Sequence, residues 1–255
     1  MEKKKKNRKG WIMMCAAILC CAAGLGACSD DDDYDYSQML PNALVTVKTA
    51  ADERCYLQLD DSTTLMPVNM KTSPFGKKEV RALVNFNPSD AASGAYSKAV
   101  TINWIDSILT KPLAEDLGGV RNDEVYGTDP VDMVADWVTI AEDGYLTLRF
   151  RIGINGNSMK RHFVNLLAGT NPDNPYEVEF RHNAYGDNGS MPSDGLVAFR
   201  LDRLPDTQGK TVKLTLKWKS PEGEKRATFN YRTRKATATN AAAAIASTRS
   251  QALLR

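Results

Sequence analysis

Two segments of the chain alternate apolar and polar residues at every second position. In the segment Tyr145–Ile152 the even-numbered residues are all apolar, and the segment Thr211–Lys219 repeats the pattern. Because successive side chains of a strand point to opposite faces, this alternation predicts antiparallel strands with one buried face. The turn-forming residues Ser220-Pro221-Glu222-Gly223 then predict a hairpin that continues to Tyr231. The chain is therefore restricted to folds built on antiparallel sheets.

Shorter strand-like runs occur along the rest of the body. They are Leu44–Val47, Cys55–Leu59, Val80–Phe86, Val100–Trp104, Trp137–Ile140, Phe163–Leu167, Glu177–His182 and Leu196–Leu201. No stretch combines helical periodicity with capping signals, so we expect few helices. The predicted fold class is all-β, with a small barrel in residues 41–128 followed by an antiparallel β-sandwich in residues 129–235. The boundary is placed at the turn-forming cluster Gly127–Asp132.

Residues 1–27 have the organisation of a secretory signal peptide. Six Lys and Arg residues precede an apolar run from Trp11 to Ala23, and small residues close the segment. The box Leu25-Gly26-Ala27-Cys28 resembles a bacterial lipobox, which predicts cleavage before Cys28 and lipidation of its thiol. An ordinary export signal and a permanent transmembrane anchor are the alternatives. Residues 28–40, which include the acidic run Asp30–Asp33, are predicted to form a tether, and the alanine-rich residues 236–255 a flexible tail.

Cleavage before Cys28 changes the charge and the cysteine content of the chain. The mature chain would carry 27 basic and 30 acidic groups, and its body from Tyr36 onward has a net charge of +2. A nearly neutral body argues against a nucleic-acid partner, which requires a clearly basic surface. Cys55 would be the only cysteine left unmodified, so no internal disulfide is expected. Its place in an alternating run predicts a buried, apolar thiol.

Both histidines of the chain flank one turn-rich loop. If the runs around this loop form a hairpin centred near Pro172, paired residues have numbers that sum to about 344, and His162 lies opposite His182. Two adjacent imidazoles with Asp187 as a third ligand would suit zinc or iron, so these three residues are the candidate metal site. A pair of semi-buried rings with a structural role is the preferred interpretation, and no metal or cofactor is predicted.

No other segment matches a catalytic motif. Gly153–Ser158 is rich in glycine but lacks the Gly-Lys-Ser/Thr ending of a phosphate-binding loop, and no serine lies in a Gly-x-Ser-x-Gly elbow. A pair of carboxylates distant in sequence would escape this search. We therefore predict a protein that is not an enzyme, with a metal-dependent or carboxylate-pair hydrolase as the alternative.

Several of these segments together resemble the NigD-like family of lipoproteins. The resemblance rests on Tyr56–Asn69, Asp143–Phe150, His162–Leu166, Pro175–Ala184 and Leu214–Trp218, and it covers roughly residues 35–232. It implies an N-terminal OB-like barrel and a C-terminal β-sandwich in a surface or periplasmic lipoprotein without an assigned activity. It implies no catalytic or ligand-binding residues. The acidic run after Cys28 resembles the surface-export signal of lipoproteins in certain Gram-negative gut anaerobes.

These observations predict a lipid-anchored outer-membrane protein that faces the cell exterior. Its contact with the membrane is the lipid on Cys28, and it acts as a binding module for an envelope protein, a glycan or a toxin through loops at one end of a domain. A bacteriocin-associated or immunity-like role is suggested only by the name of the family. A structural subunit of a surface complex is a further alternative, and a large exposed apolar patch would indicate it.

Overall fold

The structure, a computed structural model, describes residues 36–156 and 160–234. The predicted signal peptide, Cys28, most of the predicted tether and the predicted tail lie outside the described residues. Within the described ranges the chain consists of strands, one α-helix and the short 3-10 helix η1 (Tyr36–Gln38). No helix in these ranges is long and apolar enough to cross a membrane. The predicted all-β class is confirmed.

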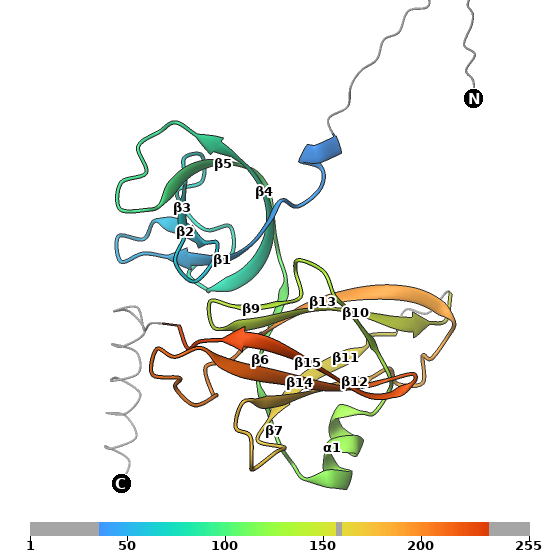
Figure 1. Cartoon of the computed structure of the whole chain (residues 1–255). Coiled ribbons are helices and arrows are strands. Elements are labelled where there is room, and N and C mark those ends of the chain that lie inside the picture. Colours follow the sequence, from blue (N-terminus) through green and yellow to red (C-terminus); the bar gives the residue numbers. More distant parts are fainter. Residues whose placement is uncertain (1–35, 157–159, 235–255) are drawn as a thin grey trace, which may run out of the picture. The chain divides into compact units, whose positions relative to one another are not determined.

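The first domain is a small closed barrel (Figure 1). Its strands follow the order β1-β2-β3-β5-β4 around the barrel. They are β1 (Ala43–Thr49), β2 (Cys55–Gln58), β3 (Thr64–Pro67), β4 (Val80–Ser89) and β5 (Lys98–Ser107). Alternate residues such as Val45, Val47 and Leu57 fill its core. Cys55 belongs to this core, which confirms the prediction of a buried, apolar thiol, and its burial raises the pKa of the thiol to about 11.

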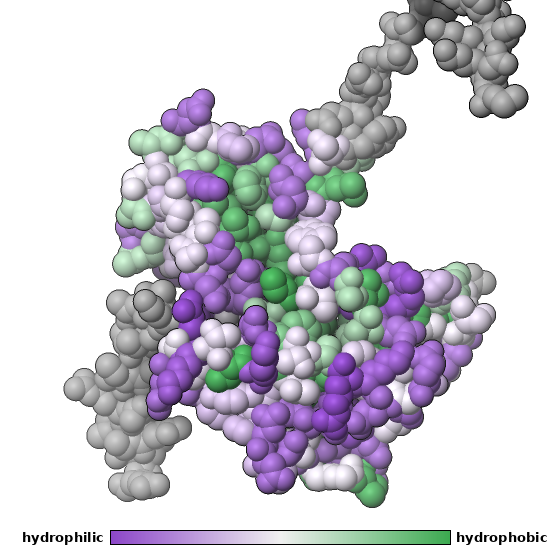
Figure 2. Space-filling model, in the orientation of Figure 1, coloured by the Kyte–Doolittle hydropathy of each residue, from purple (hydrophilic) through white to green (hydrophobic). Residues whose placement is uncertain are grey.

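The second domain is a sandwich of two sheets (Figure 1). One sheet has the order β6-β13-β10-β8 with β9 also paired to β10, and the other has the order β15-β14-β12-β11-β7. The strands are β6 (Leu109–Pro112), β7 (Ala114–Glu115), β8 (Asp132–Val134), β9 (Ile140–Glu142), β10 (Tyr145–Ile154), β11 (Phe163–Ala168), β12 (Glu177–Asn183), β13 (Met191–Arg200), β14 (Val212–Ser220) and β15 (Gly223–Tyr231). The hairpin predicted around Pro221 is confirmed, because Ser220 pairs with Gly223. In the view of Figure 2 the sandwich presents a mostly hydrophilic surface, as outward-facing polar residues require.

The chain enters the sandwich directly after the barrel. β6 pairs in parallel with β13, and β7 pairs in parallel with β11, so both precede the turn-forming cluster at Gly127–Asp132. Helix α1 (Gly119–Tyr126) follows and packs near β11 and β12. Parallel edge strands as short as β6 and β7 leave too few residues for an alternating pattern in the sequence.

Near its first residues, β10 is buried on both faces, including the face that points away from the sandwich core. Leu146 and Leu148 point into the sandwich core, as the alternation predicts. Thr147, which was expected to face solvent, is also fully buried, and Tyr145 packs with Leu44 and Ala198 in a separate apolar cluster. Leu44 belongs to the barrel, so this end of β10 contacts both domains. A period of two shows which residues share a face, but it does not show whether another domain covers that face.

Candidate functional site

The two strands that carry the histidines form the predicted hairpin, but with a different register. In the structure Val164 of β11 lies opposite His182 of β12, and Leu166 lies opposite Phe180. The prediction that His162 lies opposite His182 is therefore wrong by two residues. A shift of two keeps every side chain on its predicted face, so the apolar pattern fits both registers equally well. The turn geometry between the strands selects one of them.

The structure nevertheless brings the three predicted candidates together. His162 Nδ1 lies 2.9 Å from His182 Nε2, and the two rings stack with centroids 5.1 Å apart. His162 Nε2 lies 3.2 Å from Asp187 Oδ2. Asp187 Oδ1 accepts hydrogen bonds from the backbone N–H and the side-chain amide of Asn155, both at 2.7 Å. His182 and Asp187 are buried, so the cluster forms a buried polar network at one end of the sandwich.

The three side chains lie in a row and do not surround a common point. His162 uses one ring nitrogen toward His182 and the opposite nitrogen toward Asp187. A metal ion needs its ligands to converge on a single position about 2 Å from each donor atom. In the described residues no group of three His, Cys, Asp or Glu side chains has this arrangement. The geometry supports a hydrogen-bonded relay of Asp187, His162 and His182.

The relay holds a proton between its two imidazoles. One of the two facing nitrogens must donate and the other must accept, since they lie at hydrogen-bond distance. The far nitrogen of His182, Nδ1, is buried without a hydrogen-bond partner in residues 36–156 and 160–234. In residues 36–156 and 160–234 no hydroxyl or thiol is hydrogen-bonded to His182.

Burial of His182 makes the stability of the fold depend on pH. Burial lowers the pKa of His182 from its ordinary 6.5, the neighbouring His162 lowers it further, and Asp129 acts in the opposite direction. The unfolded chain therefore binds a proton that the folded chain does not bind. We expect the free energy of unfolding to be highest above the ordinary pKa and to fall as the pH decreases below it, by at most about 1.4 kcal/mol per pH unit.

Urea denaturation at about pH 7.5 and about pH 5.5 measures this dependence. The variant His182→Gln has no titratable group at this position, so its stability should change less over the same interval. An equal loss in the two chains would show that other groups cause the dependence.

The segment after helix α1 holds His182 in place. The backbone N–H of Asp129 donates to the carbonyl of His182 at 3.0 Å, and the Asp129 carboxylate accepts a hydrogen bond from the N–H of Ala184 at 2.7 Å. Gly127 lies against the same strand end, where a Cβ atom would come within 2.5 Å of the His182 carbonyl oxygen. Its φ of +80° is also left-handed, so two independent constraints require glycine here.

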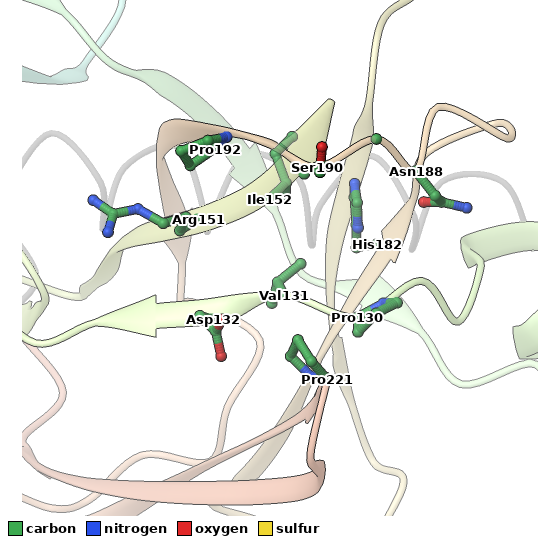
Figure 3. Close-up of a pocket in the computed structure, with 12 residues that line it drawn as sticks. Pro130, Val131, Asp132, Arg151, Ile152, His182, Asn188, Ser190, Pro192 and Pro221 are labelled. Carbon is green, nitrogen blue, oxygen red and sulfur yellow. The ribbon is translucent and has the colours of Figure 1, made fainter. Parts of the chain in front are cut away.

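A hollow of about 490 Å³ opens beside the relay. Figure 3 shows His182 on one side of this hollow and Arg151 on the other, with Val131 and Ile152 between them. Asp132, Asn188 and Ser190 add polar groups to the wall. A hollow of mixed apolar and polar lining suits the side chain of a binding partner or a small polar ligand.

A second surface feature surrounds Trp137. This tryptophan is 51% exposed, and it borders a smaller hollow of about 260 Å³ with Pro41, Arg149 and Asp194. We call these four residues the Trp137 surface. Exposed tryptophan and arginine side chains are the residue types that contribute most to protein–protein binding. Other tryptophans in the described chain, Trp104 and Trp218, are partly or fully buried.

The carboxylates of this region are held in ion pairs. Arg151 Nε lies 2.6 Å from Asp194 Oδ1, and Arg149 lies 2.7 Å from the other oxygen. The hydrogen bonds from Arg151, and then those from Arg149, lower the pKa of Asp194 to about 2. Arg149 also bonds Asp136 at 2.9 Å. The acid of a carboxylate-pair hydrolase needs a raised pKa, so Asp194 is unsuited to that role.

Sequence reasoning found His162, His182 and Asp187 but missed the residues around them. In the sequence, Gly127 and Asp129 belong only to a turn-forming cluster, and Arg151 is one of the polar, odd-numbered positions of an alternating strand. Trp137 was assigned to a strand-like run, although the structure places it before β9. Its exposure depends on tertiary packing, so no local pattern could have identified it.

Two family models match the chain. The NigD-like N-terminal OB domain matches residues 44–108, and the NigD-like C-terminal beta sandwich domain matches residues 112–231. A solved structure described as a toxin-related protein from Parabacteroides distasonis is 37% identical, with a TM-score of 0.61, over 75% of this chain and 92% of that chain.

Two more distant structures share the fold. A NigD-like immunity protein from Bacteroides caccae is 20% identical, with a TM-score of 0.53, over 74% of this chain and 96% of that chain. A protein from Bacteroides fragilis described as a lipoprotein is 13% identical, with a TM-score of 0.52, over 76% and 98% of the two chains. No functionally curated protein matches the chain significantly.

Proposed function

Because the chain belongs to the NigD-like family, we propose that it is a lipid-anchored envelope protein that binds a protein partner in an immunity-like role. The observation that carries this proposal is the 37% identical relative described as toxin-related. The match covers 92% of the length of that relative. The partner is accordingly a protein toxin or a toxin-associated protein. Binding, not catalysis, is the proposed activity.

The N-terminal sequence supports the anchoring part of the proposal. Leu25-Gly26-Ala27-Cys28 resembles a lipobox, and a protein of the same fold is described as a lipoprotein. A single lipid chain binds a membrane only reversibly, so stable anchoring requires the multiple acyl chains that bacterial lipidation of Cys28 would supply. The acidic run Asp30–Asp33 supports display on the outer side of the outer membrane.

The Trp137 surface supports the binding part of the proposal. It combines an exposed aromatic ring with Arg149 and a neighbouring ion-paired carboxylate, the composition of an interface centre with a polar rim. Arg151 lines the hollow beside His182 and also pairs with Asp194 of the Trp137 surface. The two features therefore lie on connected parts of the sandwich. We propose that the partner contacts this side of the sandwich.

Replacing Asp30–Asp33 by alanine should retain lipidation and membrane anchoring but lose surface display. The reason is that the acidic run supplies the export signal, whereas Cys28 supplies the anchor. Added protease should digest the unaltered protein on intact cells and leave the variant shielded. Digestion of both proteins at the same rate would contradict the assignment. A Cys28→Ala variant serves as the control for anchoring and should leave the membrane fraction.

A further inference from the structure

A separate polar cavity lies where the barrel meets the sandwich. It has a volume of about 620 Å³, within the usual range of small-molecule sites, and we call it the junction cavity. Its wall is formed by Lys48, Gln58, Asp61, Ser62, Asp143, Gly209, Arg232, Thr233 and Arg234. None of these residues belongs to the relay or to the Trp137 surface.

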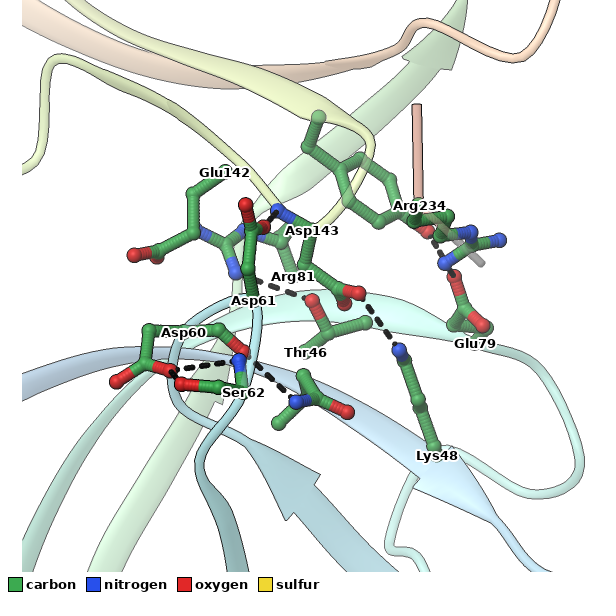
Figure 4. A network of polar contacts seen from close by, with 12 residues as sticks. Thr46, Lys48, Asp60, Asp61, Ser62, Glu79, Arg81, Glu142, Asp143 and Arg234 are labelled. Atoms are coloured by element: carbon green, nitrogen blue, oxygen red, sulfur yellow. Dashed lines mark hydrogen bonds and ion pairs between the residues drawn. The ribbon is translucent and has the colours of Figure 1, made fainter. Parts of the chain in front are cut away.

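A buried ion pair forms one wall of the junction cavity. Lys48 Nζ of β1 lies 2.8 Å from Asp143 Oδ1, and the two side chains are only 8% and 5% exposed. Asp143 occupies the two-residue turn between β9 and β10, where it has a left-handed φ of 47°. Its N–H donates to Asp61 Oδ1 at 2.9 Å. Figure 4 shows Lys48 and Asp61 approaching Asp143 from the barrel, so Lys48 holds its carboxylate and Asp61 holds its backbone N–H.

Two charged side chains on the wall, Asp143 and Arg232, can form hydrogen bonds with a ligand. Asp143 Oδ2 is buried and has no hydrogen-bond partner in the described part of the chain. A buried carboxylate oxygen without a donor is costly, and a ligand donor would remove that cost. Arg232 is 45% exposed, and its nearest carboxylate oxygen in the described residues, on Asp61, is 3.8 Å away. Its guanidinium is therefore available for a bidentate contact with an anion.

We propose that the junction cavity binds a small zwitterion, an α-amino acid or a short peptide, whose ammonium group donates to Asp143 Oδ2 and whose carboxylate accepts from Arg232. Lys48 neutralises the other oxygen of Asp143, and Asp61 lies between the two groups, 2.9 Å from the Asp143 backbone nitrogen and 3.8 Å from the Arg232 guanidinium. The wall thus offers one acceptor for an ammonium group, Asp143 Oδ2, and one donor for a carboxylate, the guanidinium of Arg232. This site is independent of the protein partner proposed above.

The test is isothermal titration of the full-length protein in detergent with the dipeptide alanyl-alanine. Two matched probes each lack one charge: N-acetyl-alanyl-alanine has no ammonium group, and alanyl-alanine amide has no carboxylate. We expect saturable binding of the zwitterion, and binding of each capped probe that is weaker by about tenfold or more. Titration with free alanine distinguishes an amino-acid ligand from a peptide, and binding of either one supports the site.

Arg232→Gln should weaken binding of the zwitterion by about tenfold or more, because it removes the bidentate donor without touching the buried pair. Arg203→Gln removes a half-exposed arginine that pairs with Glu115 away from the cavity, and it should leave binding unchanged. The proposal is overturned if neither alanine nor alanyl-alanine binds at about 10 mM, which would leave water as the occupant of the cavity. Equal binding of the capped probes, or equal affinity of Arg232→Gln and the unaltered chain, would also overturn it.

Discussion

Replacing Lys48 by methionine is expected to lower the free energy of unfolding by about 3–5 kcal/mol. The ammonium group of Lys48 is the only described cation hydrogen-bonded to the Asp143 carboxylate. Both side chains are more than nine-tenths buried, so removal of one leaves an unpaired charge in a low-dielectric environment. Urea denaturation of the variant and the unaltered chain measures the difference.

Two further variants separate the buried charge from the loss of a long side chain. Asp143→Asn combined with Lys48→Met removes both charges, and asparagine tolerates the left-handed backbone of Asp143. The double variant should be more stable than Lys48→Met alone by at least about 1 kcal/mol. Lys77→Met breaks an ion pair with Glu53 in which both side chains are more than 70% exposed, so it should cost much less than Lys48→Met. A double variant no more stable than Lys48→Met would refute the role of the buried charge.

Gly127→Ala is expected to destabilise the protein by about 2–4 kcal/mol. A Cβ atom at this position would lie 2.5 Å from the His182 carbonyl oxygen and 2.6 Å from the Asn183 side chain. The backbone of β12 cannot move away, because the Asp129 N–H is bonded to the same carbonyl. The left-handed φ adds strain of its own for any residue with a side chain. Thermal and urea denaturation measure the loss.

Gly76→Ala is the matched control for that substitution. Gly76 also has a left-handed φ, of +69°, but nothing lies within 4 Å of a Cβ atom there. Its replacement should cost only the backbone strain, about 1 kcal/mol. A similar loss at both positions would mean that contact with β12 contributes nothing at Gly127.

The alternating segments were sufficient to predict most of the fold. They identified the core face of β10 and of β14 correctly, and the position of Cys55 in its strand predicted its burial. The register of the β11–β12 hairpin was not predictable in the same way, because two registers place Val164, Leu166 and Phe180 on the same face. His162 and His182 meet despite the incorrect register, since side chains on one face of neighbouring strands remain close after a shift of two residues.

The contacts between the domains had no local signal. Lys48 and Asp143 are 95 positions apart, and each belongs to a segment in which a polar residue is expected to face solvent. Only the packing of the β9–β10 turn against the barrel buries them together. The exposure of Trp137 and the linear arrangement of the relay likewise depend on tertiary structure. Sequence patterns therefore predict faces and elements, whereas the candidate sites arise where faces of different elements meet.

The most direct test of the proposed function is capture of a partner from intact envelopes with the lipidated protein. We expect the unaltered chain to capture one or more toxin-related proteins, and Trp137→Ala to capture much less of them. Val120→Ala removes an exposed apolar side chain of helix α1 that lines neither hollow, and it should leave the capture unchanged. The Cys28→Ala form should lose the partner in envelopes but bind it after purification. Equal capture by the unaltered chain and Trp137→Ala, or no toxin-related protein in either, would contradict the account.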